Sequence, residues 1–160
     1  MQFLSPLLVA LAVASVSAES RQLQVSSVAK ELLKAVNAAR ASNGSPPLCL
    51  NAKLATASQV QAVDMAAGGF IATTGSTGST PTSRATDQGF NTTGVAELVG
   101  AGYSNASHAI SEWMSSTAYN QYLLGDYELM GAGYAYNAAQ QSKTFWVLDF
   151  SKGGLGESCV

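Results

Sequence analysis

Few side chains of this sequence could take part in acid–base, nucleophilic or metal chemistry. The 160 residues include one histidine, His108, two cysteines, Cys49 and Cys159, and ten carboxylates. A Ser-His-Asp triad would need His108 as its base, and a zinc site needs three or four N, S or carboxylate ligands at about 2.0–2.3 Å. Catalysis by a single carboxylate acting as a base would depend on Glu97, which lies within the apolar run Val95–Val99.

His108 is predicted to lie on the outer face of a helix. Apolar residues recur at helical spacing in this segment, at Ala106, Ala109, Ile110, Trp113 and Met114. His108 falls on the opposite face together with Glu112 at i+4, a spacing that suits an exposed ion pair. We therefore expect a solvated helix residue and neither a metal ligand nor a catalytic base.

The role of Glu97 remains open between structure and function. An acid pair would need a second carboxylate beside it, and the spacing of Asp64, Asp87 and Asp149 places none of them there. Asp149 lies within the strand-like run Phe145–Phe150, where alternation favours the solvent face for it. Glu97 itself could be buried and held by hydrogen bonds from a neighbouring loop, or it could act as a base.

Composition excludes several classes of partner. Charged residues make up 11% of the chain, hydrophobic residues 47%, and the net charge is −2. Binding of nucleic acid requires clustered Lys and Arg, and so does binding to an anionic membrane surface. The sequence therefore predicts a packed domain with an uncharged polar surface, and no nucleic-acid partner.

The first residues resemble a signal for export. Met1–Ala18 has an apolar stretch over Leu7–Val13, and Val16 and Ala18 suit the −3 and −1 positions of a cleavage site before Glu19. The apolar stretch is too short to span a bilayer of about 30 Å. We predict a secreted, extracellular protein with no membrane span.

Secretion favours two further modifications. In an oxidising compartment, Cys49 and Cys159 are expected to form a disulfide that ties the end of the chain to its early part. Three Asn-X-Ser/Thr sequons, beginning at Asn43, Asn91 and Asn105, are candidates for glycosylation.

Hydrophobic periodicity predicts helices first and a β-hairpin last. Ser26 and Ser27 can cap a first helix, whose apolar positions begin at Val28 and which ends at Asn43-Gly44. The other expected elements are a helix from the cap Asn51 to Gly68-Gly69, a short helical turn capped by Thr82, the helix that holds His108, and strands over Met130–Tyr136 and Phe145–Phe150. This order predicts an α+β domain with helices packed on a small antiparallel sheet. The expected organisation is a signal peptide over 1–18, a short lead over 19–26, one domain over 27–151, and a tail over 152–160 that carries Cys159.

Several segments of this domain resemble motifs of the CAP superfamily and occur in the same order. That superfamily includes cysteine-rich secretory proteins, antigen five and pathogenesis-related class one proteins, and it defines the SCP domain. The resemblance covers Val28–Ser151. It rests on the segments Leu33–Leu54, Phe70–Pro81, Ala96–Gly102, Trp113–Ser116, Tyr119–Leu124, Met130–Tyr134 and Phe145–Phe150.

The resemblance implies an α-β-α sandwich and a central cavity. In many members two His and two Glu line this cavity and can hold a divalent metal. The matching positions here are Thr73, Glu97, Ser116 and Tyr119. Only Glu97 keeps its chemistry, so we predict no metal and no cofactor.

These observations favour a secreted, non-enzymatic binding module that is a monomer. Two kinds of ligand stay open. One is an apolar small molecule such as a sterol or fatty acid, since the resemblance implies lipid binding. The other is an extracellular protein or glycan. Two alternatives remain, namely a weak hydrolase or peptidase that uses Glu97, and a structural component of a wall or matrix.

Overall fold

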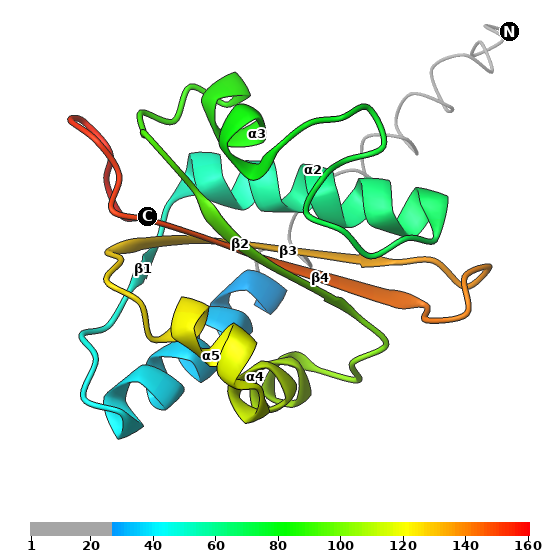
Figure 1. Cartoon of the computed structure of the whole chain (residues 1–160), viewed down its shortest axis with the longest axis horizontal. Helices are drawn as coiled ribbons and strands as arrows, with labels where there is room; N and C mark the ends of the chain where they lie inside the picture. The colour runs from blue at the N-terminus through cyan, green and yellow to red at the C-terminus, as the bar shows by residue number, and fades with distance from the viewer. Residues whose placement is uncertain (1–26) are drawn as a thin grey trace, which may run out of the picture.

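A computed structural model describes residues 27–160 of the chain. The predicted signal peptide and lead, residues 1–26, lie outside the described residues. The described chain forms three layers, with a β-sheet between two layers of helices (Figure 1). This is the α-β-α sandwich that the resemblance implies.

Four strands make up the central sheet: β1 (Cys49–Leu50), β2 (Ala96–Ala101), β3 (Leu129–Tyr136) and β4 (Thr144–Ser151). Their spatial order is β1-β3-β4-β2. The predicted hairpin is confirmed as β3 and β4, which pair antiparallel from Leu129↔Ser151 to Tyr136↔Thr144. The sheet is mixed and not purely antiparallel, because the short β1 pairs parallel with β3.

One helical layer consists of α2 (Ala52–Gly68) and α3 (Pro81–Asp87). Asn51 caps α2 as predicted, since its side chain accepts hydrogen bonds from two backbone N–H groups of the first turn. The cap predicted for the short helix was wrong. Thr80 caps α3, and the hydroxyl of Thr82 instead accepts a hydrogen bond from the backbone N–H of Val95 at 3.2 Å.

Two glycines let α2 lie close on the sheet. A Cβ atom on Gly131 would come within 2.3 Å of the backbone of Leu54, and one on Gly133 within 2.3 Å of the backbone of Ser58. Because real Cβ atoms do not approach a backbone this closely, α2 can lie at this distance only over side-chain-free positions of β3.

The other helical layer contains a helix over residues 27–42, α4 (Ala106–Ser115) and α5 (Thr117–Leu123). Asn105 caps α4 by accepting a hydrogen bond from the N–H of His108 at 2.9 Å. The main apolar core lies between this layer and the sheet, and it includes Leu32, Trp113, Trp146 and Phe150.

The C-terminal tail closes the β1 edge of the sheet. Cys49 and Cys159 form the predicted disulfide, with a Cα–Cα distance of 5.6 Å. The N–H of Val160 donates a hydrogen bond to the carbonyl of Leu50 at 2.9 Å. The backbone of β1 is therefore covered by the end of the same chain.

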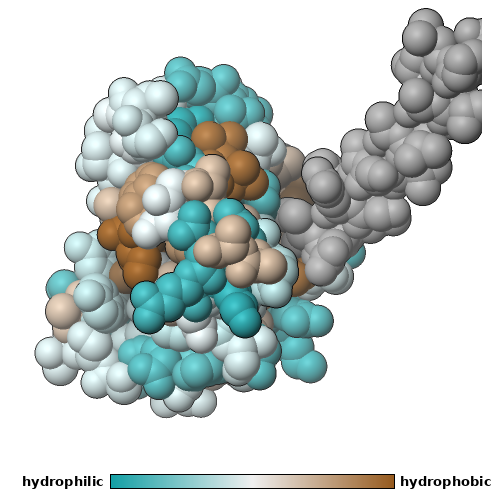
Figure 2. All heavy atoms as spheres, turned by 90° about the vertical axis from the view of Figure 1, so that its right-hand side faces the viewer, coloured by the Kyte–Doolittle hydropathy of each residue, from teal (hydrophilic) through white to brown (hydrophobic). Residues whose placement is uncertain are grey.

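The surface carries apolar side chains in small groups. On the face shown in Figure 2, brown apolar residues alternate with white and teal polar ones. Exposed large apolar side chains include Val60, Val63 and Ile71. Within residues 27–160, no helix combines the length and the hydropathy that a membrane crossing requires.

Candidate functional site

Glu97 and Asp149 lie opposite each other on neighbouring strands, on the sheet face that α2 and α3 cover. The N–H of Gly102 bonds to the carbonyl of Thr144, so Ala101 and Phe145 form a non-hydrogen-bonded pair. Pairs alternate along an antiparallel ladder, and Glu97–Asp149 is therefore of the same kind. Such pairs have the shorter Cα–Cα distance, which brings the two carboxyl groups together.

The prediction that Asp149 faces solvent is wrong. Its exposed fraction is 0%, and the hydroxyl of Ser58 on α2 donates a hydrogen bond to its Oδ2 at 2.8 Å. Alternation did place Asp149 with Phe145 and Val147, as expected. That face of β4 is covered by α2, because helices lie on both sides of this sheet and β4 has no solvent face.

The two carboxyl groups are placed to share one proton. Burial, and then the charge of Glu97, raise the pKa of Asp149 well above its ordinary value of 3.8. The pKa of Glu97 is also raised by burial, while hydrogen bonds from Asp149 and Arg84 oppose that rise. Among the described residues, Glu97 Oε1 and Asp149 Oδ1 are buried and accept no hydrogen bond. A proton on Asp149 that is donated to Glu97 would satisfy both oxygens.

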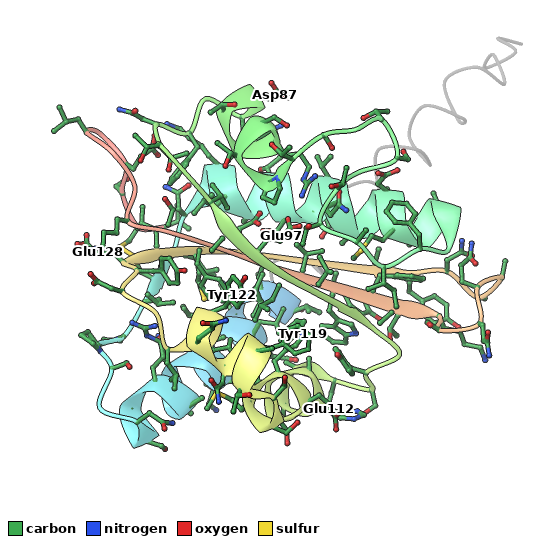
Figure 3. The ribbon with its side chains drawn as sticks, viewed as in Figure 1. Asp87, Glu97, Glu112, Tyr119, Tyr122 and Glu128 are labelled. Atoms are coloured by element: carbon green, nitrogen blue, oxygen red, sulfur yellow. A yellow bond between two sulfur atoms is a disulfide. The ribbon has the colours of Figure 1, made fainter. Side chains whose placement is uncertain are left out.

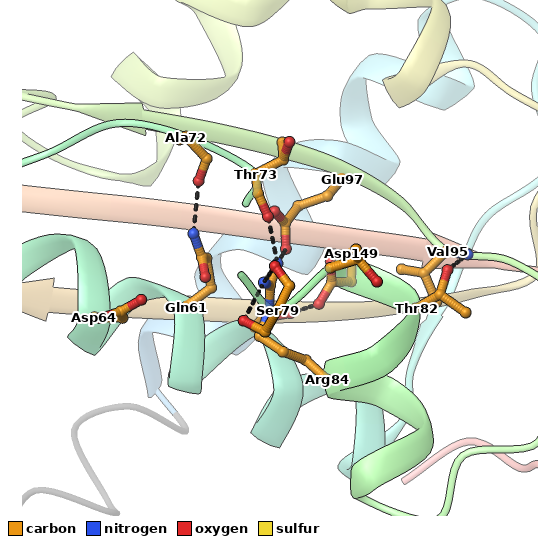
Figure 4. Close-up of polar contacts among 12 residues, drawn as sticks. Gln61, Asp64, Ala72, Thr73, Ser79, Thr82, Arg84, Val95, Glu97 and Asp149 are labelled. Carbon is orange, nitrogen blue, oxygen red and sulfur yellow. Dashed lines mark hydrogen bonds and ion pairs between the residues drawn. The ribbon is translucent and has the colours of Figure 1, made fainter. Parts of the chain in front are cut away.

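Arg84 on α3 supplies the counter-charge (Figure 4). Its Nη2 donates to Glu97 Oε2 at 2.7 Å and to the backbone carbonyl of Thr73 at 3.0 Å. Its Nη1 donates to the carbonyl and the hydroxyl of Ser79, both at 3.1 Å. The side chains of Arg84 and Glu97 are 3% and 0% exposed. One guanidinium thus balances one ionised carboxylate and holds the loop before α3 over the pair.

Reasoning from the sequence missed this cluster. The nearest expectation was that a neighbouring loop would hold Glu97 through hydrogen bonds, whereas the side chain of Arg84 holds it. One signal was present in the sequence: in a chain with only 11% charged residues, an arginine within a predicted short helix is a candidate for an ion pair. The non-local contact with Asp149 had no signal, because strand β2 was not predicted.

The structure brings together only two of the four positions that match the family's cavity. Arg84 donates hydrogen bonds both to the backbone carbonyl of Thr73 and to Glu97, and in this way connects the two positions. Thr73 itself is exposed. Ser116 and Tyr119 belong to the end of α4 and to α5, which pack on the sheet face opposite to the one that carries Asp149. Figure 3 shows Tyr119 at α5, apart from Glu97 on β2. Tyr119 is 49% exposed. No hydrogen bond or ion pair within residues 27–160 connects these two residues to the Glu97 cluster.

The residues at these positions do not fit a divalent metal. Thr73 offers a carbonyl that already accepts from Arg84, and the second oxygen of Glu97 is buried on the sheet face that also carries Asp149. The guanidinium of Arg84 already neutralises Glu97 through Oε2, so a second cation there would meet a like charge. The described part of the chain contains no group of three or more His, Cys, Asp or Glu residues that could hold a metal ion.

His108 occupies the outer face of α4, as predicted. Its Nε2 lies 3.7 Å from a carboxylate oxygen of Glu112, and both side chains are about half exposed, at 43% and 55%. Its Nδ1 faces the hydroxyl of Ser104 at 3.1 Å. The ring is therefore held in a surface network away from Glu97.

The three sequon asparagines are exposed. The amide nitrogens of Asn43 and Asn91 donate to the backbone carbonyls of Ala39 and Leu155, at 2.8 and 3.1 Å. Asn105 uses its oxygen to cap α4. Glycosylation at these positions stays a prediction.

Comparison with known proteins identifies the family. Residues 33–150 match the model of the cysteine-rich secretory protein family, CAP, which is most of the chain. The chain therefore belongs to the CAP family, in agreement with the resemblance of its motifs. No curated protein matches the sequence.

Solved structures share the fold at low sequence identity. The crystal structure of an extracellular SCP-domain protein from Bacillus anthracis superposes with a TM-score of 0.70 and 18% identity, over 79% of this chain and 41% of that protein. An outer surface protein of Borrelia burgdorferi gives a TM-score of 0.67 and 20% identity, over 78% and 92% of the two chains. A cysteine-rich secretory protein from Staphylococcus aureus gives 0.57 and 20%, over 74% and 36%. The chain thus spans about two fifths of the Bacillus protein, and these likenesses concern the fold alone.

Proposed function

We propose that this protein is an extracellular binding module of the CAP family that acts without catalysis. The state of Glu97 carries the proposal. It is the only cavity position that keeps the chemistry of the family, and it is buried, ion-paired to Arg84 through Oε2 and paired across the strands with Asp149. A buried carboxylate that is neutralised by an arginine of its own chain has little attraction left for a substrate or a metal ion.

An extracellular location agrees with several features. The disulfide between Cys49 and Cys159 suits an oxidising compartment. Two of the structurally similar proteins are described as an extracellular protein and an outer surface protein. The predicted signal peptide over residues 1–18 supports the same location.

The ligand is either an apolar small molecule, such as a sterol or fatty acid, or an extracellular protein or glycan. Native mass spectrometry of Glu19–Val160, secreted from a eukaryotic host and deglycosylated, separates these two classes. A stoichiometric lipid or sterol adduct supports the apolar ligand. A clean apo mass supports a partner that binds the surface, to be identified by pull-down.

A hydrolase that uses Glu97 is the second candidate, because the structure places a second carboxylate, Asp149, beside it. The test is hydrolysis of peptide and ester substrates by the wild type and by Glu97→Gln. We expect no turnover above background in either protein. Turnover by the wild type that disappears in a folded Glu97→Gln protein would contradict a non-enzymatic role.

A structural role in a wall or matrix predicts co-sedimentation with insoluble wall material. We expect the protein to stay in the supernatant, as a soluble binding module would. Quantitative sedimentation with the wall fraction would favour the structural alternative.

A further inference from the structure

The two edges of the sheet differ in how they are protected. At one edge, the two-residue strand β1 is covered by the tail through the disulfide and the Val160–Leu50 hydrogen bond. At the other edge lies β2, which has six residues, Ala96–Ala101. Figure 1 is viewed toward this edge: β2 runs in front of β3 and β4, and no other helix or strand crosses it.

The pairing of β2 with β4 leaves alternate backbone groups of β2 unused. Because Ala101 and Phe145 form a non-hydrogen-bonded pair, the N–H and C=O groups of Ala101 and Val99 point away from β4, whereas those of Gly100 and Leu98 point toward it. No hydrogen bond from the described residues reaches the outward groups of Val99 and Ala101. Both residues are partly exposed.

β2 also lacks the features that usually keep an edge strand from pairing. It contains no Lys, no Pro and no bulge, since its register with β4 is continuous from Ala96 to Ala101. Its one charge, Glu97, is turned inward and balanced by Arg84.

We propose that β2 pairs antiparallel with β2 of a second copy of this chain, around a two-fold axis at Gly100. In this register Val99 of each copy lies opposite Ala101 of the other. The outward N–H and C=O groups of these residues then form four inter-chain hydrogen bonds, and the two sheets join into one of eight strands.

The strand is complementary to itself, which favours a second copy as the occupant of this edge. No like charges meet across the axis, because Glu97 is already neutralised within its own chain. Gly100 brings no side chain to the axis itself. This inference goes beyond the proposed function and departs from the monomer expected from the sequence, where β2 had not been recognised as an edge strand.

Sedimentation velocity on Glu19–Val160 at concentrations up to about 1 mM tests the pairing. We expect an apparent mass that rises to twice that of the chain. Val99→Lys places a charge at the edge and should leave only monomer. Val63→Lys, a matched control at a 52% exposed position on α2, should dimerise like the wild type. Ala101→Pro removes an outward N–H without breaking a bond to β4, and it replaces Val99→Lys if that variant does not fold.

Amide hydrogen exchange locates the interface of the proposed dimer. In the dimer the amides of Val99 and Ala101 should exchange at least tenfold more slowly than in the dilute monomer. Leu98 and Gly100, which bond to β4 in both states, serve as internal references. A wild type that stays monomeric over this range would overturn the proposal, and so would a dimer that persists in the folded edge variants or leaves the amides of Val99 and Ala101 unprotected.

Discussion

Replacing Arg84 with methionine tests the ion pair that closes the Glu97 site. Methionine keeps much of the length and apolar volume of the arginine stem and removes its charge. The raised pKa of Asp149 indicates that the carboxyl pair of the wild type binds one proton, and Arg84 balances the remaining negative charge. Without Arg84, a buried carboxylate would be left unpaired, and the folded protein avoids this by binding a second proton.

The cost of that second proton sets the size of the effect. Glu97 has an ordinary pKa of 4.5, which applies to the unfolded chain. Holding it protonated in the fold therefore costs about 3.4 kcal/mol at pH 7 but only about 0.7 kcal/mol at pH 5. Loss of the hydrogen bonds to Thr73 and Ser79 adds a contribution that does not depend on pH.

Urea unfolding of the wild type and Arg84→Met at pH 7 and pH 5 measures both quantities. We expect a loss of at least about 3 kcal/mol at pH 7, or about 10 °C in Tm, and a loss smaller by about 2–3 kcal/mol at pH 5. The double variant Arg84→Met/Glu97→Gln should recover most of the pH-dependent part, since it leaves no charge to neutralise. Equal losses at the two pH values would refute the buried ion pair.

Three further changes have defined outcomes. Burial raises the pKa of Asp149 well above 3.8, so folding binds a proton there. The free energy of unfolding of the wild type should therefore fall by up to about 1.4 kcal/mol per pH unit as the pH rises from about 4 toward the folded pKa. Asp149→Asn should flatten this slope in unfolding measured from pH 5 to 8, and an unchanged slope would count against a proton on Asp149. Replacing Cys49 and Cys159 with serine removes a disulfide between residues 110 positions apart. The free energy of unfolding in urea should fall by about 4–5 kcal/mol. A change within experimental error would mean that the disulfide does not stabilise the fold. Gly131→Ala should lower the free energy of unfolding by about 1–3 kcal/mol, because its Cβ would meet the backbone of α2. Gly94→Ala, with open space around the position, serves as the control. Equal melting temperatures of the two variants would argue against the close approach of α2 to β3.

The sequence predicted the elements whose signals are local. Asn51 and Gly69 begin and end α2 through cap chemistry, and the period-two pattern of β3 and β4 identified the hairpin. His108 was placed correctly, because one helix with a clear apolar stripe decides which way its residues point.

The parts that depend on tertiary packing could not be predicted in the same way. The solvent face expected for Asp149 followed from alternation, which separates two faces but does not say which of them a helix covers. The clustering of Arg84, Glu97 and Asp149 depends on the register of β2 against β4, which no local pattern specifies. Thr80 was passed over for Thr82, two residues away, although only Thr80 forms the capping box with Ser83.

Native mass spectrometry of Glu19–Val160 with added zinc tests the central claim most directly. If Arg84 and the shared proton occupy Glu97, the protein keeps its apo mass and retains no stoichiometric zinc. One zinc ion bound at full occupancy, and lost in Glu97→Gln, would show that Glu97 is available as a ligand and would contradict the closed site.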